Sequence, residues 1–232
     1  MGSSPAWPNP GSAQSGYVVE DGESRLLLDC GPGVLGRLRA ERMKIDAVAI
    51  THFHLDHWGD LVPWAWLVAY GPADETARAE LWLPPGGIRE LDDFADRWGN
   101  PKMFEHAFDL HEFDQDAPFE AAGFTMRAQR LVHYTVQSFG FSVRDNHEGR
   151  LLAYSGDSAP CDELNELARG ADLFLCEATL AAGENDSTPR GHLSADEAIE
   201  AADGRLLLTH RPVELAPPEG TQVAHDGLVV DV

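Results

Sequence analysis

Lysine is scarce in this sequence of 232 residues. Its two lysines, Lys44 and Lys102, are among 17 basic residues that face 39 acidic ones, for a formal charge of −22 at pH 7. This charge argues against a broad nucleic-acid-binding face, because contacts to phosphates need lysine and arginine. The simplest interpretation is a solvated acidic surface. A small anionic substrate stays compatible with it, since a bound metal ion can invert the local field.

Cysteines and long apolar runs are sparse as well. The three cysteines, Cys30, Cys161 and Cys176, are scattered, and none belongs to a Cys-x-x-Cys pair. This is typical of a reducing cytosol and not of a disulfide framework. No basic segment followed by an apolar run opens the chain, and no stretch approaches the ~18 apolar residues of a membrane span. We therefore expect a cytoplasmic protein with no signal peptide and no membrane contact.

Hydrophobic residues make up 43% of the sequence, which allows a substantial core. Short apolar runs, bounded by turn residues, alternate between strand and helix patterns. We expect strands at 17–19, 25–29, 45–50, 81–83, 124–132, 139–143, 151–154, 173–176, 206–208 and near 222–230. We expect helices from 31–33 to about 43, and at 61–70, 87–98 and 194–202. Repeats, low-complexity segments and linkers are absent from the sequence, so we expect a single mixed α/β domain over residues 1–232.

The strongest chemical signal is the segment THFHLDH at residues 51–57. Imidazole and carboxylate groups are good ligands for zinc and similar divalent ions. Positions i and i+2 of an extended chain point the same way, so His52 and His54 can hold one ion together. Asp56 and His57 fall where the chain turns into the next helix, and they can face a second ion. The alternative is a run of surface histidines, which the preceding buried strand disfavours.

Further potential ligands follow other strands. His133, Asp157 and His210 each stand at or just after the end of an expected strand, as His52 does. In layered α/β folds the loops at one edge of the sheets carry the site, so we expect these side chains to meet. Four other histidines have no such spacing and are expected at the surface: His106, His111, His147 and His225. Three aromatic residues at helical spacing favour core packing over a base-stacking pocket: Trp64, Trp66 and Tyr70.

The pattern H-x-H-x-D-H, followed by a distant His, Asp and His, resembles the metallo-β-lactamase superfamily. The match runs in order along the chain, beginning with the segment LDCGPG at residues 28–33. The resemblance implies an α/β fold in the form of a four-layer αββα sandwich, with two divalent metal ions at one edge. It favours zinc, with manganese or iron as alternatives. It assigns His52, His54 and His133 to one ion, Asp56, His57 and His210 to the other, and Asp157 to a bridge.

Within that superfamily the chain resembles the branch that contains ribonuclease Z and shorter cyclic-nucleotide phosphodiesterases. The cues include the segments YSGD at 154–157, EAT at 177–179 and GHLS at 191–194. In that branch the histidine of the GHLS-like segment contacts the scissile phosphate, which implies a catalytic role for His192. Glu177 is expected to orient His192, or else only to cap a strand. Asp56 is expected to orient the attacking water besides binding metal.

These observations predict a dinuclear hydrolase acting on a small phosphodiester, such as a 3′,5′-cyclic nucleotide. The resemblance also invites a tRNA 3′-processing endonuclease, but that enzyme grips RNA with a long arm, and only residues 134–156 separate His133 from Asp157. A lactone or other ester hydrolase is a further alternative, because the same metal centre attacks carbonyl carbon. An iron redox enzyme is disfavoured by His54, where flavin-linked members usually have glutamate. An inactive module would have lost ligands.

The beginning of the chain departs from the resemblance. Related sequences open with a strand that leads into a Gly-Ser-Ser-Pro-like loop, whereas this one begins within the loop, at residues 1–5. A missing strand would leave the edge of its neighbour unpaired, and an unpaired edge invites association with another chain. A homodimer is therefore a possible state.

Overall fold

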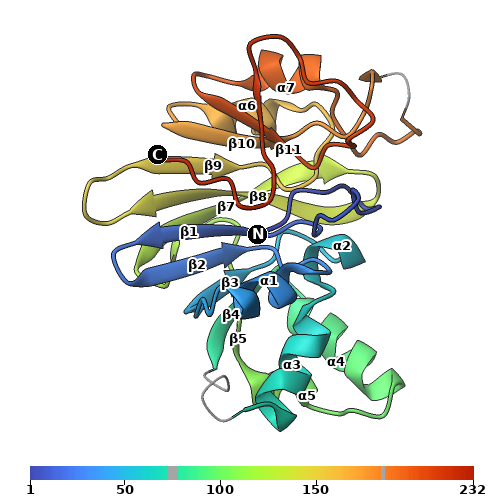
Figure 1. Ribbon diagram of the computed structural model, residues 1–232, viewed down its shortest axis with the longest axis vertical. Coiled ribbons are helices and arrows are strands. Elements are labelled where there is room, and N and C mark those ends of the chain that lie inside the picture. Colours follow the sequence, from blue (N-terminus) through green and yellow to red (C-terminus); the bar gives the residue numbers. More distant parts are fainter. Residues whose placement is uncertain (73–77, 184–185) are drawn as a thin grey trace.

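Two β-sheets pack face to face with helices on both outer sides, as Figure 1 shows for the computed structural model. The structure describes residues 1–72, 78–183 and 186–232. The first sheet has the strand order β1-β2-β3-β4-β5, and the second has the order β12-β11-β10-β9-β8-β7-β6. This arrangement is the four-layer αββα sandwich that the sequence predicts.

The first sheet lies in the N-terminal half of the chain. Its strands are β1 (Tyr17–Asp21), β2 (Ser24–Leu28), β3 (Ala47–Ala49), β4 (Ala79–Leu83) and β5 (Phe108–Glu112). Helices α1 (Val34–Ala40), α2 (Leu55–Trp58), α3 (Leu61–Tyr70), α4 (Gly87–Arg97) and α5 (Met103–Ala107) belong to the same half. Strands β2 to β5 are parallel to one another, so their carboxyl ends lie at one edge.

The second sheet follows. Its strands are β6 (Phe119–Ala121), β7 (Phe124–His133), β8 (Val136–Asp145), β9 (Leu151–Tyr154), β10 (Leu173–Glu177), β11 (Leu206–Thr209) and β12 (Gln222–Val223). Helices α6 (Asp162–Ala168) and α7 (Ala195–Ala201) cover its outer face. Because β7 and β9 are both antiparallel to β8, and β9 to β12 are parallel, β7 and β9 to β11 end at the same edge.

Three apolar clusters separate the four layers. Alternation along β2 sends Leu26 and Leu28 into the cluster between the sheets and Leu27 into the cluster under the first helices. The third cluster joins β10 and β11 to α6 and α7, with Phe174 and Leu208 on one side and Leu164 on the other. The burial of these apolar side chains holds the two sheets together. It thereby fixes the carboxyl ends of their strands relative to one another.

Several predicted elements differ from the structure. The last strand is only Gln222–Val223, because the chain turns away at Gly227, whose φ is +81°, instead of continuing in the sheet to 230. Five short elements were not predicted from the sequence, namely β5, β6, α2, α5 and α6. Trp64 is buried as predicted, but Trp66 and Tyr70 are 40% and 79% exposed and stack on each other, so they do not belong to the core.

The edge of the first sheet bears on the expected association. Among the described residues, β1 pairs with β2 on one side, and only a single antiparallel bridge, between Gly2 and Gly16, continues the ladder on the other. The homodimer stays a prediction.

Among the described residues, no helix has the length and apolar character needed to cross a membrane.

Candidate metal centre

Two groups of histidines and aspartates meet at the edge where these strands end. The first group is His52, His54, His133 and Asp157, and the second is Asp56, His57, Asp157 and His210. Within each group, one nitrogen or oxygen atom of every residue lies within 4.8 Å of the others. The structure therefore brings together all seven side chains that the sequence selects as metal ligands, with Asp157 shared between the groups.

The local fold after β3 explains how one short segment contributes to both groups. His54 has an extended backbone and precedes α2, a single helical turn in which Leu55 is 62% exposed while Asp56 and His57 are buried. The segment LDCGPG passes directly beneath this turn. A Cβ on Gly31 would lie 2.0 Å from the carbonyl oxygen of Asp56, so this close approach requires glycine.

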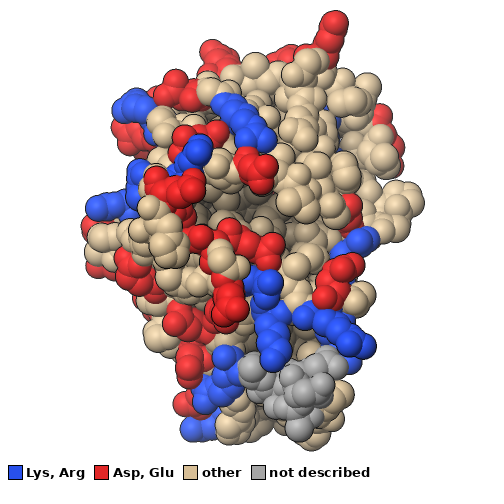
Figure 2. Space-filling view, turned by 60° about the vertical axis from the view of Figure 1, so that its left-hand side comes forward, with Lys and Arg blue, Asp and Glu red and all other residues tan. Residues whose placement is uncertain are grey.

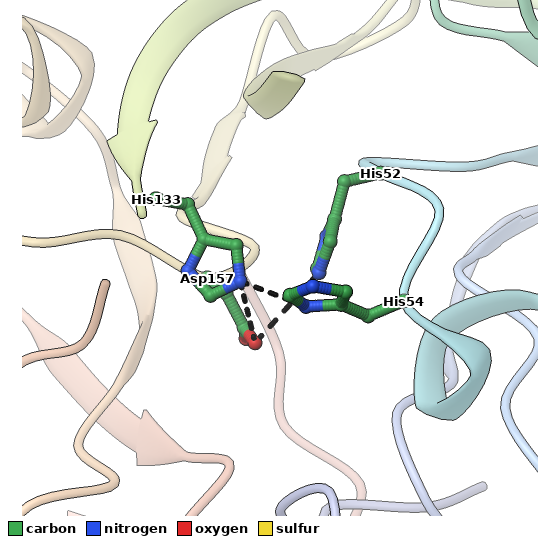
Figure 3. Close-up of side chains that lie close together, drawn as sticks. All are labelled: His52, His54, His133 and Asp157. Carbon is green, nitrogen blue, oxygen red and sulfur yellow. Dashed lines mark hydrogen bonds and ion pairs between the residues drawn. The ribbon is translucent and has the colours of Figure 1, made fainter. Parts of the chain in front are cut away.

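The first group is drawn in Figure 3, where His52 and His54 from the loop after β3 meet His133 from the end of β7 and Asp157 from the loop after β9. Nε2 of His133 lies 2.9 Å from Nδ1 of His54. Oδ2 of Asp157 lies 3.9 Å from Nε2 of His133 and 3.9 Å from Nε2 of His52. Nitrogen and oxygen atoms at these separations surround a space suited to a divalent ion.

The second group lies on the other side of Asp157. Nε2 of His210 is 3.1 Å from Oδ2 of Asp56, and Nε2 of His57 is 3.4 Å from the same oxygen. Oδ2 of Asp157 lies 3.3 Å from Nε2 of His57, whereas its Oδ1 lies 3.6 Å from Nδ1 of His210. The two carboxylates and two imidazoles thus form a second compact donor set.

The outward nitrogens of these rings have partners of their own. Nδ1 of His57 donates to Asp29 at 2.7 Å, and Nδ1 of His133 donates to the carbonyl of Gly191 at 2.6 Å. Nδ1 of His210 lies 2.8 Å from the hydroxyl of Thr179. Such contacts fix the tautomer and the ring orientation of a metal-binding histidine, and they leave Nε2 of each ring for the metal.

Asp29 has a role at this site that the sequence pattern did not indicate. Its buried carboxylate accepts hydrogen bonds from the backbone N–H and the hydroxyl of Thr51, from His57 and from the hydroxyl of Tyr154. It lies in the LDCGPG segment, at the end of β2, with a φ of +59°. That position at the ligand-bearing edge was the available signal for its role.

The pKa shifts of the three histidines in the first group suit metal binding. Burial, followed by the neighbouring imidazoles, lowers the pKa of His52, His54 and His133, so these rings stay neutral, which is the form that binds metal. Burial acts to raise the pKa of Asp157, but the charges of His210 and His57 hold it well below its usual range. The carboxylate is therefore ionised.

Three buried polar atoms of the two donor groups lack hydrogen-bond partners, and they indicate whether a metal ion fits there. Nε2 of His52, Nε2 of His57 and Oδ1 of Asp157 are buried and have no hydrogen-bond partner. A buried polar atom without a partner costs free energy, and all three belong to the donor groups and to atom types that bind divalent ions. The residues present therefore fit a metal centre.

His192 and Glu177 form an ion pair beside this centre. Nδ1 of His192 donates to Oε1 of Glu177 at 2.8 Å, and its ring stacks on that of His210 with centroids 5.7 Å apart. By distance alone Glu177, His192 and His210 could also hold a metal ion. The carboxylate of Glu177, however, already accepts bonds from Ser158, Thr179 and Leu193.

The surroundings keep His192 protonated. Burial acts to lower its pKa, but the charge and hydrogen bond of Glu177 outweigh burial and, with Asp157 and Asp186, raise it to about 9. His192 lies two residues before Ser194, the cap of α7, and its backbone N–H is bonded to Asp186.

The comparisons with known proteins agree with this geometry. Residues 24–210 match the family model described as a beta-lactamase superfamily domain. This chain belongs to the beta-lactamase superfamily. Together with the donor groups, the match makes it a metallo-hydrolase of the β-lactamase fold.

Its relatives in that superfamily span nearly the whole chain. The uncharacterized protein Rv1339 of Mycobacterium tuberculosis is 35% identical, over 91% of this chain and 79% of that protein. The probable metallo-hydrolase YhfI of Bacillus subtilis is 30% identical, over 89% of this chain and 83% of its own length. The crystal structure of YhfI superposes with a TM-score of 0.82 at 24% identity, covering 100% and 97% of the two chains. That of the short form of human tRNase Z gives 0.76 at 25% identity, covering 99% and 96%.

Proposed function

We propose that this metallo-hydrolase is a dinuclear phosphodiesterase acting on a small substrate, such as a 3′,5′-cyclic nucleotide. The observation that carries the proposal is the position of His192, hydrogen-bonded to Glu177 and stacked against His210 beside the two donor groups. A hydrogen-bond donor placed next to a metal centre suits the negative charge that develops on a phosphoryl group. Ester hydrolysis at carbon calls for such a donor less strongly.

Two divalent ions are part of the proposal. His52, His54 and His133 would hold one, and Asp56, His57 and His210 would hold the other, with Asp157 touching both. Zinc suits these nitrogen and oxygen donors, and manganese or iron are alternatives. When bound, the ions supply Lewis acidity and a water molecule of lowered pKa.

Residues of the chain would stabilise the charge on the phosphoryl group and supply a proton to the departing oxygen. With Nδ1 of His192 bonded to Glu177, its Nε2 is the nitrogen left for the substrate. The imidazolium donates a hydrogen bond to a phosphoryl oxygen or passes its Nε2 proton to the departing oxygen. Glu177 stabilises the imidazolium before that transfer, and Asp56 orients the attacking water.

Charge and shape support a small substrate. The connection from His133 to Asp157 consists of β8, a tight turn and β9, and it provides no arm that could grip RNA. Figure 2 shows acidic side chains spread across one face, with basic ones scattered among them. A long polyanion would meet repulsion over such a surface, whereas a cyclic nucleotide carries one charge that bound metal can neutralise.

The test compares four substrates at equal enzyme concentration with added zinc or manganese: 3′,5′-cyclic AMP, bis(4-nitrophenyl) phosphate, a lactone and a precursor tRNA. We expect turnover of the first two, its loss in Asp157→Ala, and little processing of tRNA. Efficient tRNA cleavage would overturn the small-substrate proposal. Turnover of the lactone alone would move the chain to ester hydrolysis.

Metal analysis of the fully loaded protein tests the dinuclear part separately. We expect two ions per chain in the wild type and fewer in Asp157→Ala, because this aspartate belongs to both donor groups. At most one ion per chain in the wild type would contradict the dinuclear assignment.

A further inference from the structure

The segment before α7 is tied to the turn between β7 and β8 by contacts that the donor groups do not use. Oδ2 of Asp186 accepts the backbone N–H groups of Gly191 at 2.8 Å and His192 at 2.9 Å. Oδ1 of the same carboxylate accepts the hydroxyl of Tyr134 at 3.1 Å. The backbone N–H of Tyr134 in turn donates to the carbonyl of Arg190 at 2.9 Å.

Tyr134 is also packed tightly in this place. A Cβ on Gly191 would lie 2.3 Å from its ring, so the ring rests directly on the glycine backbone. The ring centroid is 4.8 Å from that of His133 and 5.5 Å from that of His192. Its backbone has a φ of +48°, which is unusual for a tyrosine and persists only where the surroundings hold it. One side chain therefore contacts both the first donor group and the proposed acid.

We propose that Asp186 and Tyr134 are positioning residues that hold His192 in its working orientation. The inference rests on the proposed function, in which His192 acts on the substrate. Glu177 fixes the imidazole of His192 and Arg190 bonds its carbonyl at 3.1 Å, but its backbone N–H is held by Asp186 alone. Without that carboxylate the backbone of residues 190–192 is free to shift, and a misplacement of about 1 Å can cost on the order of 10² in rate.

The first experiment measures steady-state kinetics of Asp186→Ala, with Asp145→Ala as the matched control. Asp145 likewise accepts backbone N–H groups in a loop, from His147, Glu148, Gly149 and Arg150, but lies at the β8–β9 turn. We expect Asp186→Ala to lower kcat by roughly 10–100-fold with little change in KM or metal content. The control should keep its kcat. Equal losses in both variants would indicate general destabilisation and overturn the inference.

Tyr134→Phe separates the hydroxyl from the ring. The ring packing on Gly191 is retained, so we expect a smaller loss of kcat than in Asp186→Ala. Both variants should lose more activity toward a diester with an alkyl alcohol leaving group than toward one that releases 4-nitrophenolate, because the poorer leaving group depends more on a proton donor. Losses independent of the leaving group would contradict a role through His192.

The double variant Asp186→Ala/His192→Ala makes the test specific. If Asp186 acts through His192, the double variant should turn over no more slowly than His192→Ala. Independent, multiplying losses would overturn the proposal.

A spectroscopic measurement keeps the inference apart from the proposed function. In zinc-loaded protein with ¹⁵N-labelled histidine, the Nδ1 proton of His192 should exchange slowly with water in the wild type and in Asp145→Ala. It should exchange faster in Asp186→Ala. Unchanged exchange would overturn the positioning role even if phosphodiesters are turned over, whereas faster exchange in a protein without phosphodiesterase activity would count against the proposed function only.

Discussion

At the scale of single residues, Asp29 supports the candidate metal centre by holding one of its histidines, His57. Its carboxylate holds the ring of His57 and the backbone at Thr51, so its charge acts on the second donor group through His57. We predict that Asp29→Asn weakens metal binding by about 10–100-fold, the usual effect of losing such an outer partner. Asparagine tolerates the positive φ at this position, so the fold should survive. Competition with a chromogenic chelator measures the change, and unaltered affinity would contradict it.

His192 gives a pH-dependent prediction for the metal-free protein. Its pKa in the folded chain is raised from the ordinary 6.5 to about 9, so folding favours the protonated ring. The stabilisation is fully present below about pH 6.5 and is lost as the pH rises through about 9. We predict that the wild type gains stability relative to His192→Gln at pH 6 and loses this gain at pH 10. The difference in free energy of unfolding between the two proteins should shrink by on the order of a few kcal/mol between these pH values. Urea titrations at both values check this, and a constant difference would refute it.

Residue types and spacing predicted the donors but not what holds them. His52, His54, Asp56 and His57 stand out because imidazoles and carboxylates cluster after a buried strand. The partner of His133 is a backbone carbonyl, at Gly191, and a carbonyl has no sequence signature. Partners such as Asp29 and Thr179 are common polar residues whose role depends on packing between distant segments. The position of Asp29 at the ligand-bearing edge was legible in the sequence, but its contact with His57 was not.

At the scale of elements, Phe113 anchors the connection that follows β5, because its side chain packs in the apolar cluster between the two sheets. This ring is 2% exposed, stacks on Phe119 with centroids 5.5 Å apart, and meets Phe139 and Phe141 edge-on at 5.1 and 5.4 Å. We predict that Phe113→Ala lowers the free energy of unfolding by about 3–5 kcal/mol, from lost burial and the cavity left behind. Urea unfolding measures it. Tyr70→Ala is the matched control, because that ring is 79% exposed, and it should change stability by less than about 0.5 kcal/mol. Equal effects in the two variants would contradict this account.

The elements that the sequence predicted well have strong local signals. The helix after Ser194 begins with a capping box, in which Ser194 and Glu197 each bond the other's backbone N–H, and both residues are legible in the sequence. The elements it omitted are short or polar, such as α6 with seven residues and β5 with the sequence FDLHE. Their structure comes from packing against sheets that assemble from distant parts of the chain, and a local pattern does not contain that information.

At the scale of the whole molecule, a formal charge of −22 acts on every state of the chain. Like charges repel more strongly in the compact state than in the extended one, so the charge lowers stability when it is not screened. The screening length falls from about 30 Å at 0.01 M salt to about 3 Å at 1 M. Salt should therefore stabilise the fold over the range in which repulsion between distant carboxylates is suppressed.

We predict that the free energy of unfolding of the metal-loaded protein rises by at least ~1 kcal/mol between 0.01 and 1 M KCl, or about 2–4 °C in Tm for a chain of this size. Thermal unfolding followed by circular dichroism measures the change. Glu163→Gln/Glu166→Gln, which removes two exposed carboxylates from α6, should be more stable than wild type at low salt and should gain less from added KCl. Glu20→Gln is the matched control, because Glu20 is paired with Arg25 at 2.5 Å and its loss removes an attraction. If salt left Tm unchanged, or if both variants responded alike, local ion pairs and not the overall charge would govern the stability of this acidic chain.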